Sequence, residues 1–280
     1  MSAVVRDDLS RRDPRERISK SFVRKAEGCG MSAWLSIHDP RPWRPPEKVS
    51  FGSAVDAGVE LLIAYLRSDQ PPDIDRAHAG AMERVKDDPN PPEPAEVREA
   101  LRLWLAWDVV AETDFAYAVT QPHIRLELQG IGEVDAHPDL ILKDAGGYEH
   151  IIDVKTAKAA KPANAAATSY TELGFYALLR EAETGGEVAT VAYWTFVRSK
   201  KPYWQRVWAP VSPHMILVAS HRVSAVARAL EADALLNEGA AHPTNSVFVA
   251  PPRYGCGDCE HHPAVGGSCT WAEELEEVAA

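Results

Sequence analysis

The sequence contains no long uninterrupted run of apolar residues. The first twelve residues, MSAVVRDDLSRR, lack an apolar stretch of the length that a secretory signal peptide requires. No other segment approaches the roughly 20 apolar residues that a membrane-spanning helix needs. Internal repeats and low-complexity segments are absent as well. We therefore expect a cytoplasmic protein without a membrane span.

Cysteine is scarce, and the chain of 280 residues has four: Cys29, Cys256, Cys259 and Cys269. Because cytoplasmic thiols stay reduced, a Cys-x-x-Cys pair followed by a third cysteine favours a metal site over disulfides. The spacing suits tetrahedral thiolate coordination of a structural Zn²⁺ or of an iron-sulfur cluster. His261 and His262 are alternative ligands in a zinc site.

Positive charge is under-represented, since 30 Lys and Arg residues face 41 Asp and Glu residues and the net charge is -11. This balance counts against a nucleic-acid partner, because duplex binding gains affinity from cations that neutralise phosphates. The charge is unevenly distributed, however. Basic residues crowd positions 11–25, segment 198–206 mixes bases with aromatics, and acidic residues collect in 69–99. A locally basic groove and a solvated surface are both compatible with this segregation.

The composition, 45% hydrophobic over 280 residues, permits one sizeable core. Hydrophobic periodicity predicts helices at 19–35 with a break at Gly28-Cys29-Gly30, and at 50–67, 95–117, 167–182 and 213–236. Strands are predicted at about 123–130, 133–142, 148–155, 188–197 and 203–209. We expect a mobile segment 1–17, a main domain 18–237 with a helical insertion at about 69–117, and a cysteine-rich segment 238–280.

The most informative stretch holds two predicted strands separated by Gly146-Gly147. Side chains alternate along a strand, so Asp153 and Lys155 project to the same side. A tight reversal at the glycines would pair the strands antiparallel and bring Asp139 close to Asp153. Two carboxylates and a lysine would then share a pocket. The alternative is an ordinary hairpin with an exposed ion pair.

Such a trio has a chemical use in phosphodiester hydrolysis. Mg²⁺ prefers carboxylate oxygens and retained waters, and it can polarise a phosphoryl oxygen and activate a water. The ammonium of Lys155 could orient that water or offset charge in the transition state.

Pro138-Asp139 and Asp153-Val154-Lys155 resemble the two halves of the PD-(D/E)xK nuclease signature, and the segment IIDVKT is similar to RecB-like nuclease domains. The order of predicted elements is also that of the restriction-endonuclease-like core. The resemblance implies an α/β fold with a mixed central sheet flanked by helices. It further implies a metal-dependent DNA exonuclease that uses Mg²⁺ or Mn²⁺ and acts at DNA ends.

The resemblance extends to two helices. Segment 51–60 resembles the amino-terminal helix where many members carry a metal-binding histidine, and Asp56 stands at that place. Segment 172–178 is similar to a motif that usually begins with Gln and keeps a Tyr four residues later, but here it begins with Glu172 and keeps Tyr176. The implied catalytic set is Asp139, Asp153, Lys155, Glu172 and Tyr176, with metal ligands Asp56, Asp139 and Asp153.

One early and three late cysteines resemble the iron-sulfur nucleases of this family, including AddB-type and CRISPR-adaptation exonucleases. The resemblance implies a [4Fe-4S] cluster, held by Cys29, Cys256, Cys259 and Cys269, that joins segment 238–280 to the first helix. Zinc is the less favoured occupant. Implied partners are DNA with a free end and proteins of recombination, phage replication or CRISPR adaptation.

Several alternatives stay open at this point. Asp135, in a Gly-x-x-Asp form that RecB-like domains also show, has the same strand parity as Asp139. His137 lies between them, and a lone strand histidine is more often simply hydrogen-bonded than catalytic. The protein could also be a catalytically inactive DNA-binding or complex-assembly subunit, or a zinc-stabilised interaction module.

Overall fold

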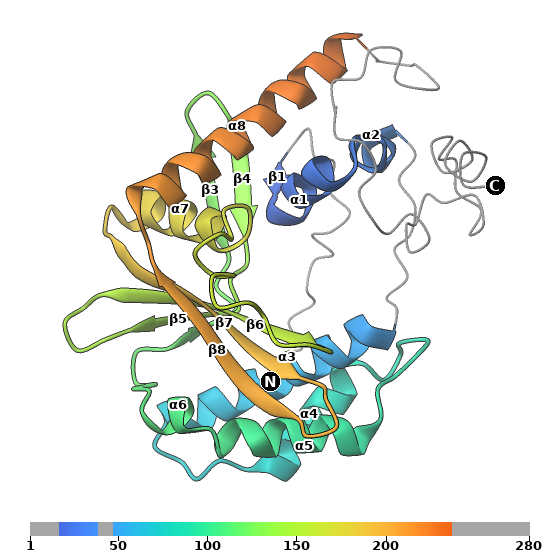
Figure 1. Cartoon of the computed structure of the whole chain (residues 1–280), viewed down its shortest axis with the longest axis vertical. Coiled ribbons are helices and arrows are strands. Elements are labelled where there is room, and N and C mark those ends of the chain that lie inside the picture. Colours follow the sequence, from blue (N-terminus) through green and yellow to red (C-terminus); the bar gives the residue numbers. More distant parts are fainter. Residues whose placement is uncertain (1–16, 39–46, 237–280) are drawn as a thin grey trace. The chain divides into compact units, whose positions relative to one another are not determined.

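The computed structural model describes residues 17–38 and 47–236. Its contacts divide them into two compact units, which we name by their sheets (Figure 1). The five-stranded unit holds residues 47–124 and His137–Leu217, and the three-stranded unit holds residues 17–38, Arg125–Ala136 and 218–236. Within these described residues, no helix combines the length and apolar character needed to cross a bilayer.

The sheet of the five-stranded unit has the order β2-β5-β6-β7-β8. Its strands are β2 (Val119–Thr120), β5 (Leu140–Lys143), β6 (Glu149–Ala157), β7 (Val188–Val197) and β8 (Tyr203–Pro210). β6 pairs antiparallel with β5 and parallel with β7, while the β2–β5 and β7–β8 pairs are antiparallel. The sheet is therefore mixed, and β6 lies at its centre.

Helices cover both faces of this sheet. α3 (Glu47–Arg67), α4 (Ile74–Arg84), α5 (Pro94–Leu105) and the short α6 (Asp108–Ala111) lie on one side, and α7 (Leu173–Thr184) lies on the other (Figure 1). α7 makes the crossover between the parallel strands β6 and β7. This arrangement confirms the predicted α/β class with a mixed sheet flanked by helices.

Alternation along β7 sorts its side chains between the two faces. Trp194 and Phe196 join the apolar core beneath α3 and α5, whereas Tyr193 points to the other face and hydrogen-bonds Glu172 ahead of α7. Aromatic rings dominate the core, and Trp204 on β8 donates its indole N–H to the backbone oxygen of Ala100 on α5 (2.9 Å). The helical layer is thereby fixed to the sheet that carries the site.

Gly58 lets α3 and α5 approach closely. A Cβ placed there would lie 2.6 Å from Cδ2 of Leu101, which is closer than carbon atoms can pack. Glycine is a poor helix former, and the close packing of α3 on α5 offsets this cost.

The three-stranded unit has the sheet order β1-β4-β3, formed by β1 (Ile18–Ser19), β4 (Gly132–Ala136) and β3 (Ile124–Leu128). α1 (Lys20–Gly28) starts at Ser19, whose hydroxyl accepts the N–H of Phe22, and α2 (Gly30–His38) follows Cys29. α8 (Pro213–Leu236) begins in the five-stranded unit and has most of its residues in this one. The predicted helix break at Cys29 is confirmed.

Two helix predictions were wrong at their ends. The helix predicted over 95–117 stops at Leu105, because Trp107 leaves the helical path to pack against Trp194 and Trp204, with ring centroids 5.5 and 6.0 Å away. The helix predicted from 167 begins at Leu173, because the Ser169 hydroxyl accepts the N–H of Leu173 and forms a turn ahead of the helix.

The strand predicted over 133–142 was also wrong, since it is two strands in different sheets. β4 ends at Ala136 and β5 begins at Leu140. Pro138, between them, has no N–H to donate to a ladder, which disfavours a continuous strand through this corner. The shared parity of Asp135 and Asp139 therefore carries no meaning here.

We expect Trp104→Ala to lower the free energy of unfolding by about 3–5 kcal/mol, because it removes a large ring from the core. Trp104 is 0% exposed and packs against Phe115 and Trp194. Trp208→Ala is the matched control, since Trp208 is 54% exposed and its loss should change stability by less than about 1 kcal/mol. Urea denaturation measures both, and equal losses would contradict the core assignment.

An ion pair joins α7 to β6. Both oxygens of Glu149, whose side chain is 13% exposed, accept hydrogen bonds from Arg180 (2.6 and 2.7 Å). This bidentate contact lowers the pKa of Glu149 below its ordinary value of 4.5. The lowered pKa means that the pair stabilises the fold above that ordinary value and loses its effect as the pH falls through the folded pKa.

Arg180→Ala should therefore destabilise the protein by about 1 kcal/mol at pH 7. The difference from wild type should shrink below pH 4.5, the ordinary pKa of Glu149. Urea midpoints measured between pH 3 and pH 7 test this, and a difference that stays constant with pH would contradict it.

Candidate active site

The central strand β6 carries two charged side chains on one face. Asp153 is 1% exposed, and its Oδ2 lies 2.5 Å from Nζ of Lys155, whose side chain is 29% exposed. The neighbouring residue Ile152 points to the opposite face and belongs to the apolar core. The alternation predicted from the sequence thus places this acid–amine pair in the interior of the sheet rather than on an exposed hairpin.

Asp139 reaches the same strand from the corner before β5. Its Oδ2 accepts the backbone N–H of Val154 (2.7 Å), the residue between Asp153 and Lys155. Its own backbone oxygen accepts the N–H of Gln121 (2.9 Å). The antiparallel β5–β6 register, with Leu140 opposite Ile152, sets this position. The turn at the glycines therefore brings Asp139 beside Asp153, as the hairpin geometry predicted.

Asp56 on α3 joins the group through Gln121. The side-chain nitrogen of Gln121 donates to Oδ2 of Asp56 at 2.9 Å and lies 3.5 Å from Oδ1 of Asp139. Carboxylates of α3 and of the corner before β5 are thereby linked by one amide.

Glu172, directly ahead of α7, approaches Lys155 from the helical side. Its Oε1 lies 3.3 Å from Nζ of Lys155, and its Oε2 accepts the hydroxyl of Tyr193 (2.7 Å). Tyr193 in turn shares a hydrogen bond with Ser169 (2.6 Å). Glu172 is 7% exposed, so both of its oxygens have partners in a water-poor setting.

Two hydrogen bonds to the loop after β6 hold a second lysine near Tyr193. The side-chain amide of Gln205 both accepts from the backbone N–H and donates to the backbone oxygen of Lys161 (2.8 and 3.0 Å). Nζ of Lys161 lies 4.1 Å from the centroid of the Tyr193 ring, within cation–π range.

Tyr176 lies on α7 and is 1% exposed. Its hydroxyl is 3.4 Å from Oδ1 of Asp153, a long hydrogen bond. Burial, and then the neighbouring carboxylates, raise the pKa of Tyr176 well above its ordinary value of 10.0. The phenol therefore stays protonated and orients Asp153.

Negative charge dominates the site, because these contacts connect the carboxylates of Asp56, Asp139, Asp153 and Glu172 with the Lys155 ammonium. Burial alone would lower the pKa of Lys155. The charges of Asp153, Glu172 and Asp139 outweigh burial, however, and raise the pKa above its ordinary value of 10.5. Lys155 is thus a protonated amine at neutral pH.

The donor set fits a hard divalent cation. Its ligand atoms are carboxylate oxygens, which Mg²⁺ and Mn²⁺ favour, and they come from α3, the corner before β5 and the central strand β6.

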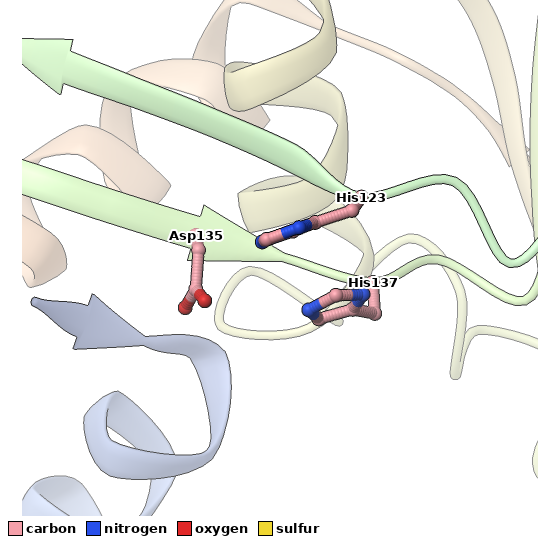
Figure 2. Close-up of side chains that lie close together, drawn as sticks. All are labelled: His123, Asp135 and His137. Atoms are coloured by element: carbon pink, nitrogen blue, oxygen red, sulfur yellow. The ribbon is translucent and has the colours of Figure 1, made fainter. Parts of the chain in front are cut away.

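Asp135 makes different contacts. In β4 of the three-stranded unit its Oδ2 is 3.1 Å from Nη1 of Arg17, and both side chains are at most 5% exposed. His137, in the five-stranded unit, stacks on His123 with ring centroids 4.1 Å apart (Figure 2). The contacts of Asp135 and His137 thus differ from those of the Asp153–Lys155 group.

The cysteine site is not tested by the structure. Cys29 is half-buried between α1 and α2, and its N–H donates to the backbone oxygen of Lys25 (2.9 Å). Cys256, Cys259 and Cys269 lie outside the described residues.

Sequence reasoning missed four side chains of the site: Gln121, Lys161, Ser169 and Tyr193. None belongs to a motif, and each is brought in by sheet pairing or loop packing. A usable signal existed only for Tyr193, which is a polar aromatic residue inside an apolar strand pattern.

Comparisons with known proteins agree with this geometry. The family model described as PD-(D/E)XK nuclease superfamily matches residues 17–264. A crystal structure from Eubacterium rectale, named "putative exonuclease", shares 11% identity at a TM-score of 0.55, covering 82% of this chain and 86% of its own. That of SSO0001 shares 13% identity at a TM-score of 0.30, covering 73% and 84%, which is too distant to carry an argument.

No curated protein matches the chain. The Eubacterium rectale structure supports the fold alone, since its sequence identity is low. The family match, by contrast, includes both halves of the signature, Pro138-Asp139 and Asp153-Val154-Lys155. From the described fold and a match over residues 17–264, the chain belongs to the PD-(D/E)XK nuclease superfamily.

Proposed function

We propose that the protein is a metal-dependent DNA exonuclease that hydrolyses phosphodiester bonds at DNA ends. The observation that carries this proposal is the convergence of Asp139, Asp153 and Lys155 on the central strand of the sheet. We place the enzyme in the cytoplasm, and its protein partners in recombination, phage replication or CRISPR adaptation.

Asp139 and Asp153 would hold a Mg²⁺ or Mn²⁺ ion, with Asp56 as an auxiliary ligand. When bound, such an ion polarises a phosphoryl oxygen and lowers the pKa of a water. Asp153 is prepared for this role by its partners, because Lys155 and Tyr176 each contact one of its oxygens. Asp139 is prepared by the N–H of Val154, which fixes one carboxylate oxygen.

Lys155 is proposed as the catalytic cation. Its ammonium lies within hydrogen-bond reach of Asp153 and Glu172 and has N–H groups to donate to a water or a phosphate. An ammonium held beside the attacked phosphate orients the water and offsets the charge that develops on the phosphoryl oxygens.

Glu172 and Tyr176 act through their neighbours. Glu172 holds Lys155 from the side opposite Asp153, and the Tyr193 hydroxyl fixes the second oxygen of Glu172. Tyr176 is too buried to meet a phosphate in this conformation and instead orients Asp153. We therefore propose both as positioning residues.

The choice of an exonuclease over other nucleases rests on the resemblance of the segment IIDVKT to RecB-like nuclease domains. The net charge of -11 is compatible with DNA binding if cationic side chains next to the site contact the DNA backbone. Lys158 and Lys161 follow β6 directly and are suited to this contact.

Lys155→Ala should lower kcat on end-labelled linear DNA by about 100–1,000-fold, the typical cost of removing a donor aimed at developing charge. Lys143→Ala is the matched control, since Lys143 on the adjacent strand β5 is 47% exposed and should leave kcat within about twofold of wild type. The assay uses Mg²⁺ or Mn²⁺.

Closed circular DNA of the same sequence should resist wild-type protein, because it has no end. Digestion of the circular DNA would contradict the exonuclease assignment and indicate an endonuclease instead. If wild type binds linear DNA without consuming it under any divalent ion, the protein is a binding or assembly subunit instead. Equal kcat for Lys155→Ala and wild type would remove Lys155 from the mechanism.

We also propose a [4Fe-4S] cluster on Cys29, Cys256, Cys259 and Cys269, which supplies a structural tie rather than chemistry at the site. Purified protein should then be coloured and contain iron and acid-labile sulfide. Cys269→Ala should lose the colour and fold poorly. Stable, colourless protein that contains zinc would contradict the cluster and favour a thiolate zinc site.

A further inference from the structure

Gln121 has an unusual backbone at the edge of the candidate site. It follows β2 directly and has φ of 47°, in the left-handed region that residues with a Cβ rarely adopt. Pro122 comes next, and a following proline disfavours the right-handed helical region as well. A strained conformation persists only where its surroundings enforce it, and such positions cluster at functional sites.

The surroundings of Gln121 are carboxylates. Its backbone N–H donates to the backbone oxygen of Asp139 (2.9 Å), which holds residue 121 against the corner before β5. Its side-chain nitrogen donates to Oδ2 of Asp56 (2.9 Å) and lies 3.5 Å from Oδ1 of Asp139. An amide NH₂ carries two hydrogens, so it can serve both carboxylates at once.

This contact addresses a physical difficulty of the site. Asp56 comes from α3 and Asp139 from the corner before β5, and two anions from separate elements repel each other. The other oxygen of Asp139 is already fixed by the N–H of Val154 (2.7 Å). The Gln121 amide contacts both side chains and so constrains the separation between Asp139 and Asp56.

We infer that Gln121 is a positioning residue that holds Asp56 and Asp139 together as a preformed pair of oxygen donors for a divalent cation. The inference rests on the proposed metal-dependent function and adds a residue that no motif of the chain contains. Residues that orient metal ligands from behind typically change metal affinity by about 10–100-fold when they are removed.

Gln121→Gly tests the side chain apart from the backbone conformation. It removes the amide, and glycine adopts positive φ without strain. The dissociation constant for Mn²⁺, measured by calorimetry on metal-free protein without DNA, should rise by about 10–100-fold. The urea midpoint of the metal-free variant should stay within about 0.5 M of wild type, because relief of the backbone strain offsets the two lost hydrogen bonds. The increase in Tm on adding Mn²⁺ should shrink accordingly.

Two further variants sharpen the test. Gln121→Asn keeps an amide and tolerates positive φ, but it is one methylene shorter, so it should bind Mn²⁺ as weakly as Gln121→Gly. Gln70→Ala is the matched control, because it removes the same amide from an exposed position between α3 and α4 that the site does not use. Its Mn²⁺ affinity should equal that of wild type.

Wild-type Mn²⁺ affinity in Gln121→Gly would overturn the inference and leave the proposed function intact. Weaker binding accompanied by a fall of more than about 1 M in the urea midpoint of the metal-free protein would overturn it too, because it would show a general structural role. A wild-type protein that binds neither Mn²⁺ nor Mg²⁺ would overturn the proposed metal-dependent function together with this inference.

Discussion

The rest of the site depends on one ion pair, between the buried Asp153 and the half-buried Lys155 on the central strand of the five-stranded sheet. A buried carboxylate is costly without a partner, and here the partner comes from the same strand two residues away. Because β6 is paired on both sides, the strand cannot rotate these two side chains away from each other. Glu172 and Tyr176 each contact a member of this pair, and Asp139 accepts the N–H of Val154 between them.

The contacts around the pair connect it to carboxylates from three further elements. Glu172 ahead of α7 contacts Lys155, Asp139 of the corner before β5 accepts the N–H of Val154, and Gln121 links Asp139 to Asp56 of α3. Carboxylate oxygens gathered in this way are the ligands that hard divalent cations favour. The neutral donors Gln121, Tyr176 and Tyr193 each donate a hydrogen bond to one of these carboxylates.

Departures from the family motifs make sense in this network. Glu172, where the motif usually has Gln, gains a second acceptor oxygen, and Tyr193 occupies it while Lys155 contacts the other. Asp56, where many members have His, is met by the amide of Gln121 rather than left to face Asp139 alone. In both cases the carboxylate accepts a hydrogen bond from a neighbouring strand or loop.

Local sequence by itself determined the elements with strong patterns. These include the apolar strand that became β7, the helix break at Cys29, and the Asp153–Lys155 parity, which follows from the two-residue period of any strand. The family and the α/β class also followed from the sequence, because ordered motifs on predicted strands resemble few other folds.

Tertiary structure gives Asp135 and Asp139 different partners. The two residues have the same parity in a continuous strand, but the chain passes from one sheet to another at Pro138. Asp135 therefore forms an ion pair with Arg17, and Asp139 accepts the N–H of Val154. Only packing could end a helix at Leu105 for the sake of Trp107, or bring Gln121 beside Asp56, 65 positions earlier in the chain. Contacts between residues so far apart leave no periodic trace in the sequence, because they depend on how strands pair and on which side chains fill the space between them.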